Sequence, residues 1–553
     1  MKYISAIILV LAFSMGVADA QTAAVKNAEK SVFKLITYKS DGSQLAVSNG
    51  VFVGKSGEAI SNLKPFIGAS KAVVTDSKGN EMNVTRILGV NDLYDVARFR
   101  VEGKSQPLGL SSAKQGGKVW LLQYPKDSSK PIQAIVKSVE TFMGKYSYYI
   151  FTAPKPNGGV ACPFVDDGGN VIGIMQLSAK GDEMHATDAA FIGNLHTTGL
   201  SFNDATMRKI GIPAALPTDK DQALLALMMS GQGGDSLKYV SAAGDFISQY
   251  PDLVDGYVAR SQMFANANDF DGASKEMEAA IKNVSKKDEA HFNYGKIIYN
   301  KEVYKSNVEY KPWSLDKALA ETDKAYEINP LPLYRHQKAQ IIFAEGKYQE
   351  AYDIFTELTK TPIRNPEIFY EASRCKQMMK APTSEILALL DSAINNVDTL
   401  RITDAAPYFL ARAEVYNAGD SFRQAVFDYT RYEVLVNGNV DAQFHYVREQ
   451  AEVKAKLYKQ ALNDISLAIL KSPKEPLFYA EKASLELKVN MVGDAITTAK
   501  LCVQVAPEYA DGYLLLGLAQ IHNNEKADGL ANLEEAKQLG SSQAQPLIDK
   551  YSK

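Results

Sequence analysis

Cysteine is scarce in this chain of 553 residues, which contains only Cys162, Cys375 and Cys502. Three thiols that lie far apart form at most one disulfide, so a disulfide framework is excluded and buried free thiols are expected. Zinc-ligand spacings, the glycine-rich Walker loop and the GxSxG nucleophile elbow are also missing. We therefore expect no metal and no cofactor site.

A large excess of one charge is missing as well. Lysine and arginine number 61 against 64 aspartates and glutamates, a net charge of −3 with both signs interspersed. Such a chain has no basic field for nucleic acid. Beyond residue 20, no run reaches the roughly 18 consecutive apolar residues that cross a bilayer, so we expect no membrane span.

The first 20 residues have the pattern of a cleavable signal peptide. Lys2 precedes an apolar run from Ile4 to Val17, and the small residues Ala18 and Ala20 then form a typical cleavage site. The mature chain would begin near Gln21, and no cysteine follows the cleavage site to carry a lipid anchor. We expect an exported bacterial protein, with the periplasm and secretion as open alternatives.

The length predicts at least two domains, and the composition changes near residue 220. Upstream, short apolar segments alternate with turn residues, which predicts a β-barrel or a β-sandwich. The predicted strands are 31–38, 47–54, 71–76, 82–90, 95–101, 118–124, 132–142, 148–153, 171–177 and 188–195. Downstream, the apolar residues have a helical period. We place a β domain at 25–205, a linker at 206–220 and a helical array at 221–553.

The helical part repeats at a fixed interval. Ala461, Ala495 and Gly529 share one position of the repeat, and Ala468, Cys502 and Ala536 share another. Small residues at these two positions allow two helices of one unit to pack closely. The interval, about 34 residues, resembles that of the tetratricopeptide repeat (TPR), and we count about eight units with a C-terminal capping helix. The resemblance implies an all-α superhelix whose concave face binds a protein or peptide partner.

Three segments of the β part, 50–70, 87–101 and 157–174, follow one another in the order of a trypsin-like serine protease of the HtrA type. They read GVFVGKSGEAISNLKPFIGAS, ILGVNDLYDVARFRV and NGGVACPFVDDGGNVIGI. The resemblance covers roughly residues 30 to 200 and implies a double β-barrel. In that family the three segments hold the catalytic histidine, aspartate and serine.

Two of these three catalytic positions have lost their chemistry. The resemblance places Lys64 at the histidine, Asp95 at the aspartate and Val160 at the nucleophile. Valine has no nucleophilic atom, and a lysine in water remains protonated at neutral pH. Ala161 and Cys162 replace the two following glycines, so an oxyanion turn at Gly158 is doubtful.

A relocated active site is the alternative. No histidine precedes His185, so the usual histidine–aspartate–serine order is absent. Cys162 with His185 as its base is the remaining pair capable of nucleophilic chemistry. A buried structural thiol at Cys162 is the competing interpretation. For Lys64, the alternatives are an ion pair with Asp95 and a side chain turned to solvent.

Aspartate and glycine cluster at 166–169, where a metal loop and a strand-to-strand turn are the two interpretations, and turn chemistry favours the second. The segments 55–58 and 76–81 are interpreted as hairpin turns in the same way.

The resulting hypothesis is an exported protein-binding scaffold: a degenerate trypsin-like barrel joined to a TPR array. The first alternative is an active serine- or cysteine-type endopeptidase that recruits substrates through its repeats. The second is a structural scaffold of the cell envelope. The sequence leaves the partner and the oligomeric state open.

Overall fold

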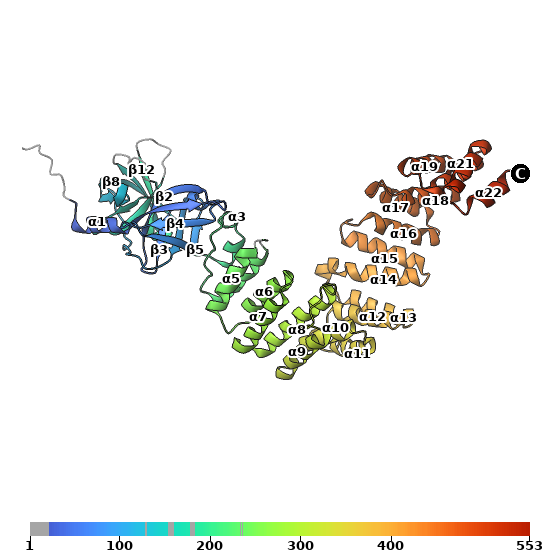
Figure 1. The fold of residues 1–553 in the computed structure, drawn as a ribbon, viewed down its shortest axis with the longest axis horizontal. Helices are drawn as coiled ribbons and strands as arrows, with labels where there is room; N and C mark the ends of the chain where they lie inside the picture. The colour runs from blue at the N-terminus through green and yellow to red at the C-terminus, as the bar shows by residue number, and fades with distance from the viewer. Residues whose placement is uncertain (1–20, 128–129, 153–159, 177–182, 233, 235) are drawn as a thin grey trace, which may run out of the picture. The chain divides into compact units, whose positions relative to one another are not determined.

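The computed structural model describes residues 21–127, 130–152, 160–176, 183–232, 234 and 236–553. The predicted signal peptide, 1–20, lies outside this part. The chain divides into two compact units, Met1–Ile297 and Ile298–Lys553. Two antiparallel β-barrels come first, and a long all-α region follows (Figure 1). This architecture confirms the predicted fold class.

The first barrel closes in the strand order β1-β2-β3-β6-β5-β4. Its strands are β1 (Val32–Tyr38), β2 (Gln44–Phe52), β3 (Glu58–Ser61), β4 (Lys71–Thr75), β5 (Glu81–Asn91) and β6 (Val96–Val101). The helix α1 (Ala23–Ala28) precedes it. Inward residues such as Phe33 and Phe99 form its core, as expected for closed strands of period two.

The second barrel closes in the order β10-β11-β12-β9-β8-β7. Its strands are β7 (Lys118–Leu121), β8 (Ile132–Phe142), β9 (Tyr146–Thr152), β10 (Pro163–Val165), β11 (Val171–Gln176) and β12 (Met184–Asp188). Phe151 and Phe164 stack in its core with ring centroids 3.9 Å apart. A separate apolar cluster, which includes Val51 and Val165, joins the two barrels.

The strand predicted at 188–195 is wrong, because α2 (Ala189–Gly193) occupies this segment. Asp188 begins the helix: its side chain accepts a hydrogen bond from Ala190 N at 2.8 Å. A short apolar run does not distinguish a strand from one helical turn. The last strand, β12, lies just before it, and the pattern predicts neither β12 nor the short β3.

Three short elements link the second barrel to the first long helices. They are the 3-10 helix η4 (Gly199–Asn203), α3 (Ala205–Arg208) and an extended segment at 213–215. This segment runs parallel to β5: Ile87 N donates to Pro213 O at 2.9 Å, and Ala215 N donates to Ile87 O at 2.8 Å. The connection is therefore fixed onto the first barrel.

The all-α region consists of consecutive helices that pack against their neighbours in the chain. In the first unit these are α4 (Lys220–Gln232), α5 (Ser236–Gln249), α6 (Asp255–Asn266), α7 (Phe270–Asn283) and the first part of α8 (Lys287–Tyr304). The second unit continues with α9 (Leu315–Ile328), α10 (Pro332–Ala344), α11 (Tyr348–Leu358), α12 (Pro366–Met378), α13 (Thr383–Asn395), η5 (Thr399–Ala405), α14 (Ala406–Ala418), α15 (Phe422–Leu435), α16 (Ala442–Lys454), α17 (Tyr458–Lys471), α18 (Pro476–Lys488), α19 (Val492–Val505), α20 (Ala510–His522), α21 (Lys526–Gln538) and α22 (Ala544–Tyr551).

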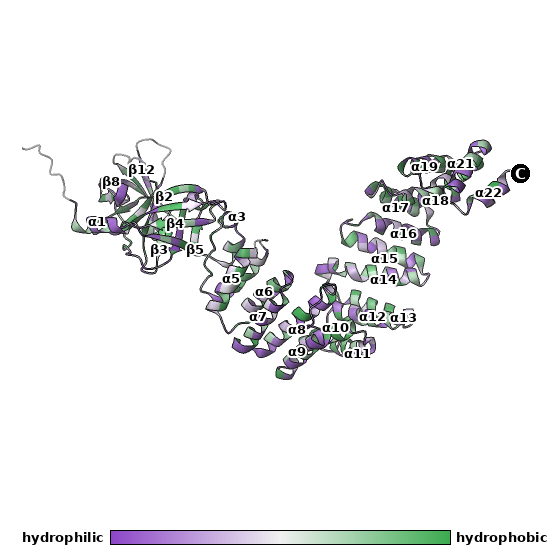
Figure 2. Cartoon of the chain, in the orientation of Figure 1, coloured by the Kyte–Doolittle hydropathy of each residue, from purple (hydrophilic) through white to green (hydrophobic). Residues whose placement is uncertain are grey.

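The repeat of the sequence is visible in these bounds, because α16, α18 and α20 begin at equivalent positions, Ala442, Pro476 and Ala510. Hydrophobic and hydrophilic residues mix along the helices, as expected of helices with one buried face (Figure 2). The small residues lie where helices cross. A Cβ on Gly529 of α21 would stand 2.7 Å from Gly517 O of α20, so this crossing needs glycine.

All three cysteines are free and buried, which confirms the prediction of buried free thiols. In the part of the chain that the structure describes, no helix combines the length and the apolar character needed to span a membrane.

Candidate functional site

Lys64 and Asp95 lie close together in the first barrel. Lys64 begins the 3-10 helix η2 (Lys64–Phe66) after β3, and Asp95 immediately precedes β6. Lys64 Nζ is 3.8 Å from Asp95 Oδ2, and the Lys64 side chain is 76% exposed. Both sequence interpretations therefore hold in part, since the lysine points largely to solvent while it pairs with the carboxylate. An exposed pair of this kind contributes less than about 1 kcal/mol.

Asp95 is bound more firmly to the backbone than to Lys64. Its Oδ1 accepts hydrogen bonds from Lys64 N at 2.8 Å and from Leu63 N at 3.2 Å. Its own φ is +47°, a left-handed conformation that is uncommon outside glycine. The carboxylate thus holds the turn after β3, a structural role that requires no imidazole beside it.

Val160 is linked to the same region through β2. Asn49 Nδ2 donates to Val160 O at 3.1 Å, and Asn49 O accepts a hydrogen bond from Ser61 Oγ at 2.5 Å. The Val160 side chain packs against the apolar cluster between the barrels. The following residue, Ala161, is buried with φ at +62°. The predicted nucleophile position therefore presents an aliphatic group to a packed core, and Gly158 lies outside the described residues.

An aromatic cluster packs against the same interbarrel core. Tyr94, next to Asp95, lies 4.5 Å from Phe142 between ring centroids. Phe191 contacts Phe142 at 5.1 Å and Tyr146 at 5.2 Å. These rings come from separate segments of the chain, so the spacing of aromatic residues in the sequence did not predict the cluster. Their ring faces add apolar surface beside Asp95.

Cys162 is buried in the core of the second barrel. Burial, with a smaller contribution from the charge of Asp127, raises the pKa of the Cys162 thiol to about 12. The thiolate is the nucleophilic form, so this environment disfavours the reactive form of the sulfur at neutral pH.

His185 lies on β12, where its ring contacts partners other than the thiol. Its Nδ1 is 3.2 Å from the hydroxyl of Tyr148, and its Nε2 is 3.7 Å from Glu183 Oε2. An imidazole placed between a phenol and a carboxylate is oriented by them.

The cluster at 166–169 forms the turn between β10 and β11. Asp166 Oδ1 accepts a hydrogen bond from Asn170 N at 2.9 Å, and Asp167 Oδ1 accepts one from Trp120 Nε1 at 2.7 Å. Both carboxylates therefore have structural partners, which confirms the turn interpretation. Within the described ranges, no group of three or more histidine, cysteine, aspartate or glutamate side chains is arranged to hold a metal ion.

The second unit contains a small pocket between α8, α10 and α12, which we call the array pocket. Its volume is about 50 Å³, and it is lined by Tyr299, Gln340, Phe343, Phe355, Glu371 and Arg374. Gln340 Nε2 donates to Glu371 Oε1 at 2.6 Å, and His336 Nε2 lies against the other carboxylate oxygen. The guanidinium of Arg374 covers the ring of Phe343 at 5.1 Å. Aromatic walls with an oriented carboxylate and a cation suit a polar side chain of a partner.

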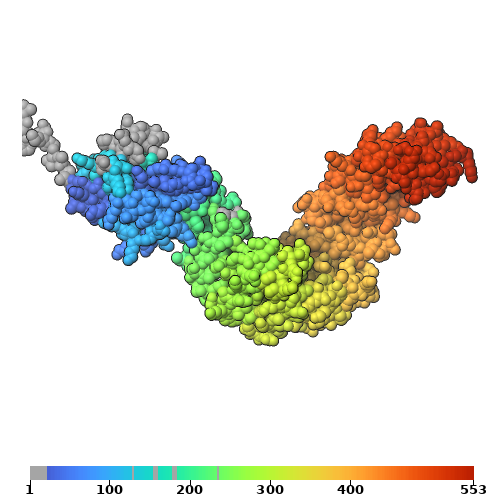
Figure 3. Space-filling view, viewed as in Figure 1, coloured from blue at the N-terminus to red at the C-terminus, as the bar shows by residue number. Residues whose placement is uncertain are grey.

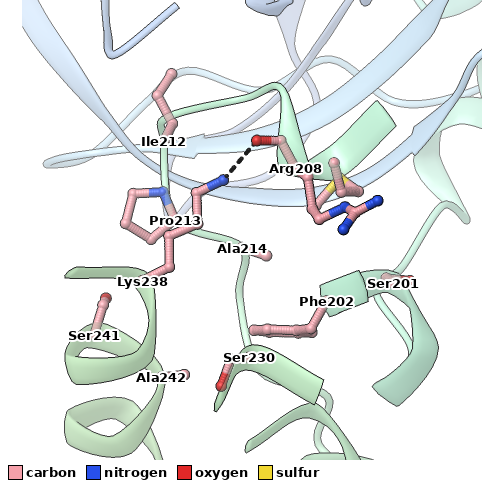
Figure 4. A pocket seen from close by; sticks show the side chains of 11 residues that line it. Ser201, Phe202, Arg208, Ile212, Pro213, Ala214, Ser230, Lys238, Ser241 and Ala242 are labelled. Carbon is pink, nitrogen blue, oxygen red and sulfur yellow. Dashed lines mark hydrogen bonds between the residues drawn. The ribbon is translucent and has the colours of Figure 1, made fainter. Parts of the chain in front are cut away.

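A further cavity, of about 80 Å³, lies where η4 and α3 meet α4 and α5 (Figure 4). Lys238 Nζ donates to Arg208 O at 3.1 Å and closes one side of it. The hydroxyl of Ser230 is bound to Leu227 O at 2.7 Å. The first bond fastens α3 to α5, and the second lies within α4, so neither group is free to bind a ligand and we assign the cavity to packing.

Comparison with known proteins gives limited similarity. No protein-family model and no curated protein matches the chain. Among solved structures, the active form of the Rv3671c protease from M. tuberculosis is 18% identical, with 32% of this chain and 82% of that chain covered and a TM-score of 0.28. The inactive form of the Rv3671c protease is also 18% identical, over 32% and 91%, with a TM-score of 0.27.

Proposed function

We propose that this protein is an exported binding scaffold in which a trypsin-like barrel without peptidase activity, at 25–205, is joined through 206–220 to a TPR array. The array takes a protein or peptide partner on its concave face. In this proposal the leader at 1–20 directs the chain to the periplasm or to secretion. The single observation that carries the binding role is the array pocket, where the carboxylate of Glu371 is oriented by Gln340 and His336 beside aromatic side chains.

The loss of catalysis is supported by the three triad positions. The Lys64 side chain is exposed, Asp95 accepts hydrogen bonds from the backbone, and Val160 packs against the core between the barrels. A nucleophile, a base and its orienting group must all lie within hydrogen-bond reach for acyl transfer. None of the three side chains provides a nucleophilic atom activated by a neutral base.

The TPR assignment is supported by the fixed recurrence of small residues and by the close crossing of α20 and α21. Stacked repeats of this kind bury a continuous core and leave an extended surface for partners. Apart from Phe355 of α11, the residues that line the array pocket come from the alternate helices α8, α10 and α12. The pocket therefore lies on one side of successive helix pairs.

We expect the full chain to hydrolyse neither casein nor fluorogenic peptides above the rate of buffer alone. Val160→Ser is expected to remain inactive, because Lys64 still occupies the position of the base. The measurement is initial rate against enzyme concentration, with an active serine protease as the positive control. Turnover that Cys162→Ser abolishes would contradict the proposal and establish a cysteine-type peptidase.

Thiol labelling provides the control for that outcome. With a pKa of about 12, Cys162 at neutral pH holds on the order of 1000 times less thiolate than an ordinary cysteine. Labelling of the native chain by iodoacetamide should therefore be at least about 1000-fold slower than labelling of the unfolded chain. Rapid native labelling at Cys162 would favour the peptidase.

We expect Glu371→Ala to weaken partner capture by about 10-fold or more, because a charged hydrogen-bond partner is removed from the pocket. The full chain, immobilised, is exposed to an envelope extract of the native cells, and stoichiometric partners are quantified by mass spectrometry. Glu350→Ala, an exposed glutamate on α11, is the matched control. Equal capture by both variants would place the partner site elsewhere and overturn the role of the array pocket.

A further inference from the structure

A large cleft of about 980 Å³ lies in the first unit, between the outside of the first barrel and helix α5. Its barrel wall carries Arg86, Arg98 and Arg100, and we call it the arginine cleft. The first barrel and the helices that follow it are in contact in the space-filling view (Figure 3). Neither the triad positions nor the array pocket line this cleft.

The strand pattern places the three guanidinium groups on one surface. In β6, Ala97, Phe99 and Val101 point into the barrel core, so Arg98 and Arg100 project outward. Arg86 of β5 lies directly opposite Arg100 in the sheet register. Like charges in cross-strand contact destabilise a sheet unless counter-charges neutralise them.

Two of the arginines have a carboxylate partner. Arg86 binds Asp245 of α5 with two hydrogen bonds, from Nε at 2.9 Å and from Nη2 at 2.7 Å. Arg100 Nη2 lies 3.5 Å from Glu58 Oε1. The first pair is a bidentate fork, and the second is a long contact that an incoming anion can replace.

Arg98 forms no ion pair with a carboxylate in the described part of the chain. Its Nη1 donates to the backbone oxygen of Leu195 at 3.1 Å. Its Nε is buried and has no hydrogen-bond acceptor among the described residues. Burial is also the main reason that the pKa of Arg98 lies below its ordinary value, although the charge of Glu58 acts in the opposite direction. A half-buried guanidinium without a contacting counter-ion is costly, so a bound anion would relieve this cost.

Several of the other polar groups that line the cleft have hydrogen-bond partners within the protein. Asp219 Oδ1 accepts a hydrogen bond from Gln222 N at 3.0 Å and caps α4. His196 Nδ1 lies 3.0 Å from Asn194 O. The acidic groups in and beside the cleft, Asp219, Asp245 and Glu58, each therefore have a partner other than Arg98.

The walls of the cleft are held in place by one close backbone approach and by side-chain hydrogen bonds to backbone oxygens. Gly89 permits the segment 195–196 to approach β5, because a Cβ there would stand 2.6 Å from His196 N. Thr197 Oγ1 donates to Ala215 O at 2.6 Å, and Gln249 Nε2 donates to Pro217 O at 2.8 Å. A site with fixed walls loses little entropy when a ligand binds.

We propose that the arginine cleft binds a carboxylate-bearing ligand, whose carboxylate engages Arg98 with Arg100 beside it. The planar guanidinium matches a carboxylate with two parallel hydrogen bonds. The volume is at the upper end of the range for small-molecule sites. Acidic side chains of an extended peptide and a free dicarboxylate share this chemistry and are separated below. The site is independent of partner binding at the array pocket.

The test uses the full chain and two probes, succinate and an acetylated, amidated hexaglutamate peptide, with binding measured by isothermal titration calorimetry. Arg98→Gln is expected to weaken binding of the recognised probe by about 10-fold to 100-fold, the usual effect of a lost charged hydrogen bond. Lys71→Gln, an exposed cation on β4 of the same barrel, removes equal charge and should change affinity by less than about 2-fold.

Each result decides the assignment. Binding of hexaglutamate alone identifies an acidic peptide site, and binding of succinate alone identifies a small-molecule site. If neither probe binds the parent protein, or if inorganic phosphate displaces them equally well, the carboxylate site is wrong. Arg100→Gln, on the exposed part of the strand, provides a second variant should Arg98→Gln melt at a lower temperature than the parent. Undiminished affinity in both variants would likewise overturn the proposal.

Discussion

Arg448→Ala is expected to lower the free energy of unfolding of the second unit by about 3–5 kcal/mol, the cost of breaking a buried ion pair. Arg448 lies on α16 with its side chain 7% exposed, and Asp464 on α17 is 3% exposed. Their fork consists of Nε to Oδ2 at 2.5 Å and Nη2 to Oδ1 at 2.9 Å. The remaining Nη1 binds Glu433 of the preceding α15 at 2.7 Å. One guanidinium therefore bridges three helices.

The same bridge recurs in the array at a fixed spacing. Arg412 of α14 binds Asp428 of α15, again with two hydrogen bonds, and also contacts Asp391 of the preceding α13. The sequence separation between the arginine and its main carboxylate is the same in both bridges. This spacing joins the first helix of a pair to the second, while the additional contact joins the pair to its predecessor. Removal of Arg448 would leave Asp464 charged and buried, which is the costly state.

Denaturant unfolding followed by far-ultraviolet circular dichroism measures this effect, since the helices dominate the signal. Arg260→Ala is the matched control: Arg260 is 33% exposed and contacts Glu276, at the same sequence separation, at 2.8 Å. We expect it to cost no more than about 1 kcal/mol. The double variant Arg448→Met, Asp464→Leu should recover most of the loss, because it removes both charges of the buried fork and leaves unpaired only Glu433, whose side chain is 25% exposed. Equal losses for Arg448→Ala and Arg260→Ala would contradict the argument.

The fold was predictable where one local pattern decides the structure. The alternation of apolar and polar residues at 95–101 predicted β6. The recurrence of small residues at a fixed interval predicted where helices of the array cross. The prediction failed at 188–195, where the cap of Asp188 outweighs an apolar run too short to show a period. The turns at 55–58, 76–81 and 166–169 follow from their own residues, and Asp76 Oδ1 accepts hydrogen bonds from three successive backbone N–H groups.

The sites were predictable only where family resemblance fixed a position. Lys64 and Asp95 were named from the sequence, but the backbone role of Asp95 depends on a turn geometry that sequence does not specify. The arginine cleft joins Arg86, Arg98 and Asp245, which lie in separate elements, so only the tertiary structure brings them together. The two buried arginine–aspartate forks of the array differ from the arginine cleft in this respect. In both forks the arginine and the aspartate are separated by the same number of residues in the sequence. A search for opposite charges at that spacing could have found them.

Glu452→Gln is expected to stabilise the second unit by about 2–4 kcal/mol near pH 9 and by much less near pH 5, because a buried ionised carboxylate is removed. Glu452 lies on α16 and is 4% exposed. Burial first, and then the charge of Asp464, raises its pKa to about 8, although Arg448 acts in the opposite direction. Its Oε2 has no hydrogen-bond partner in the described part of the chain.

The direction of the pH dependence follows from the number of protons that Glu452 binds in the folded and in the unfolded chain. Between its ordinary value near 4.5 and about pH 8, Glu452 binds a proton in the folded chain and releases it in the unfolded chain. Its contribution to stability is therefore fully present below that window and is lost as the pH rises through it. Glu449, whose pKa burial raises to about 7, adds a decline of the same sign that ends earlier. Thermal melts across this range, with Glu350→Gln as the exposed control, measure the effect.

The two predictions are coupled through one cluster. Above about pH 8 the ionised Glu452 gains an attraction to Arg448, which is the interaction that lowers its pKa. Arg448→Ala removes this attraction, so its destabilisation should grow with pH, and the growth should vanish in the double variant Arg448→Ala, Glu452→Gln. A cost of Arg448→Ala that is independent of pH would show that Glu452 titrates without sensing the arginine, and would leave the fork with Asp464 as the whole source of the effect.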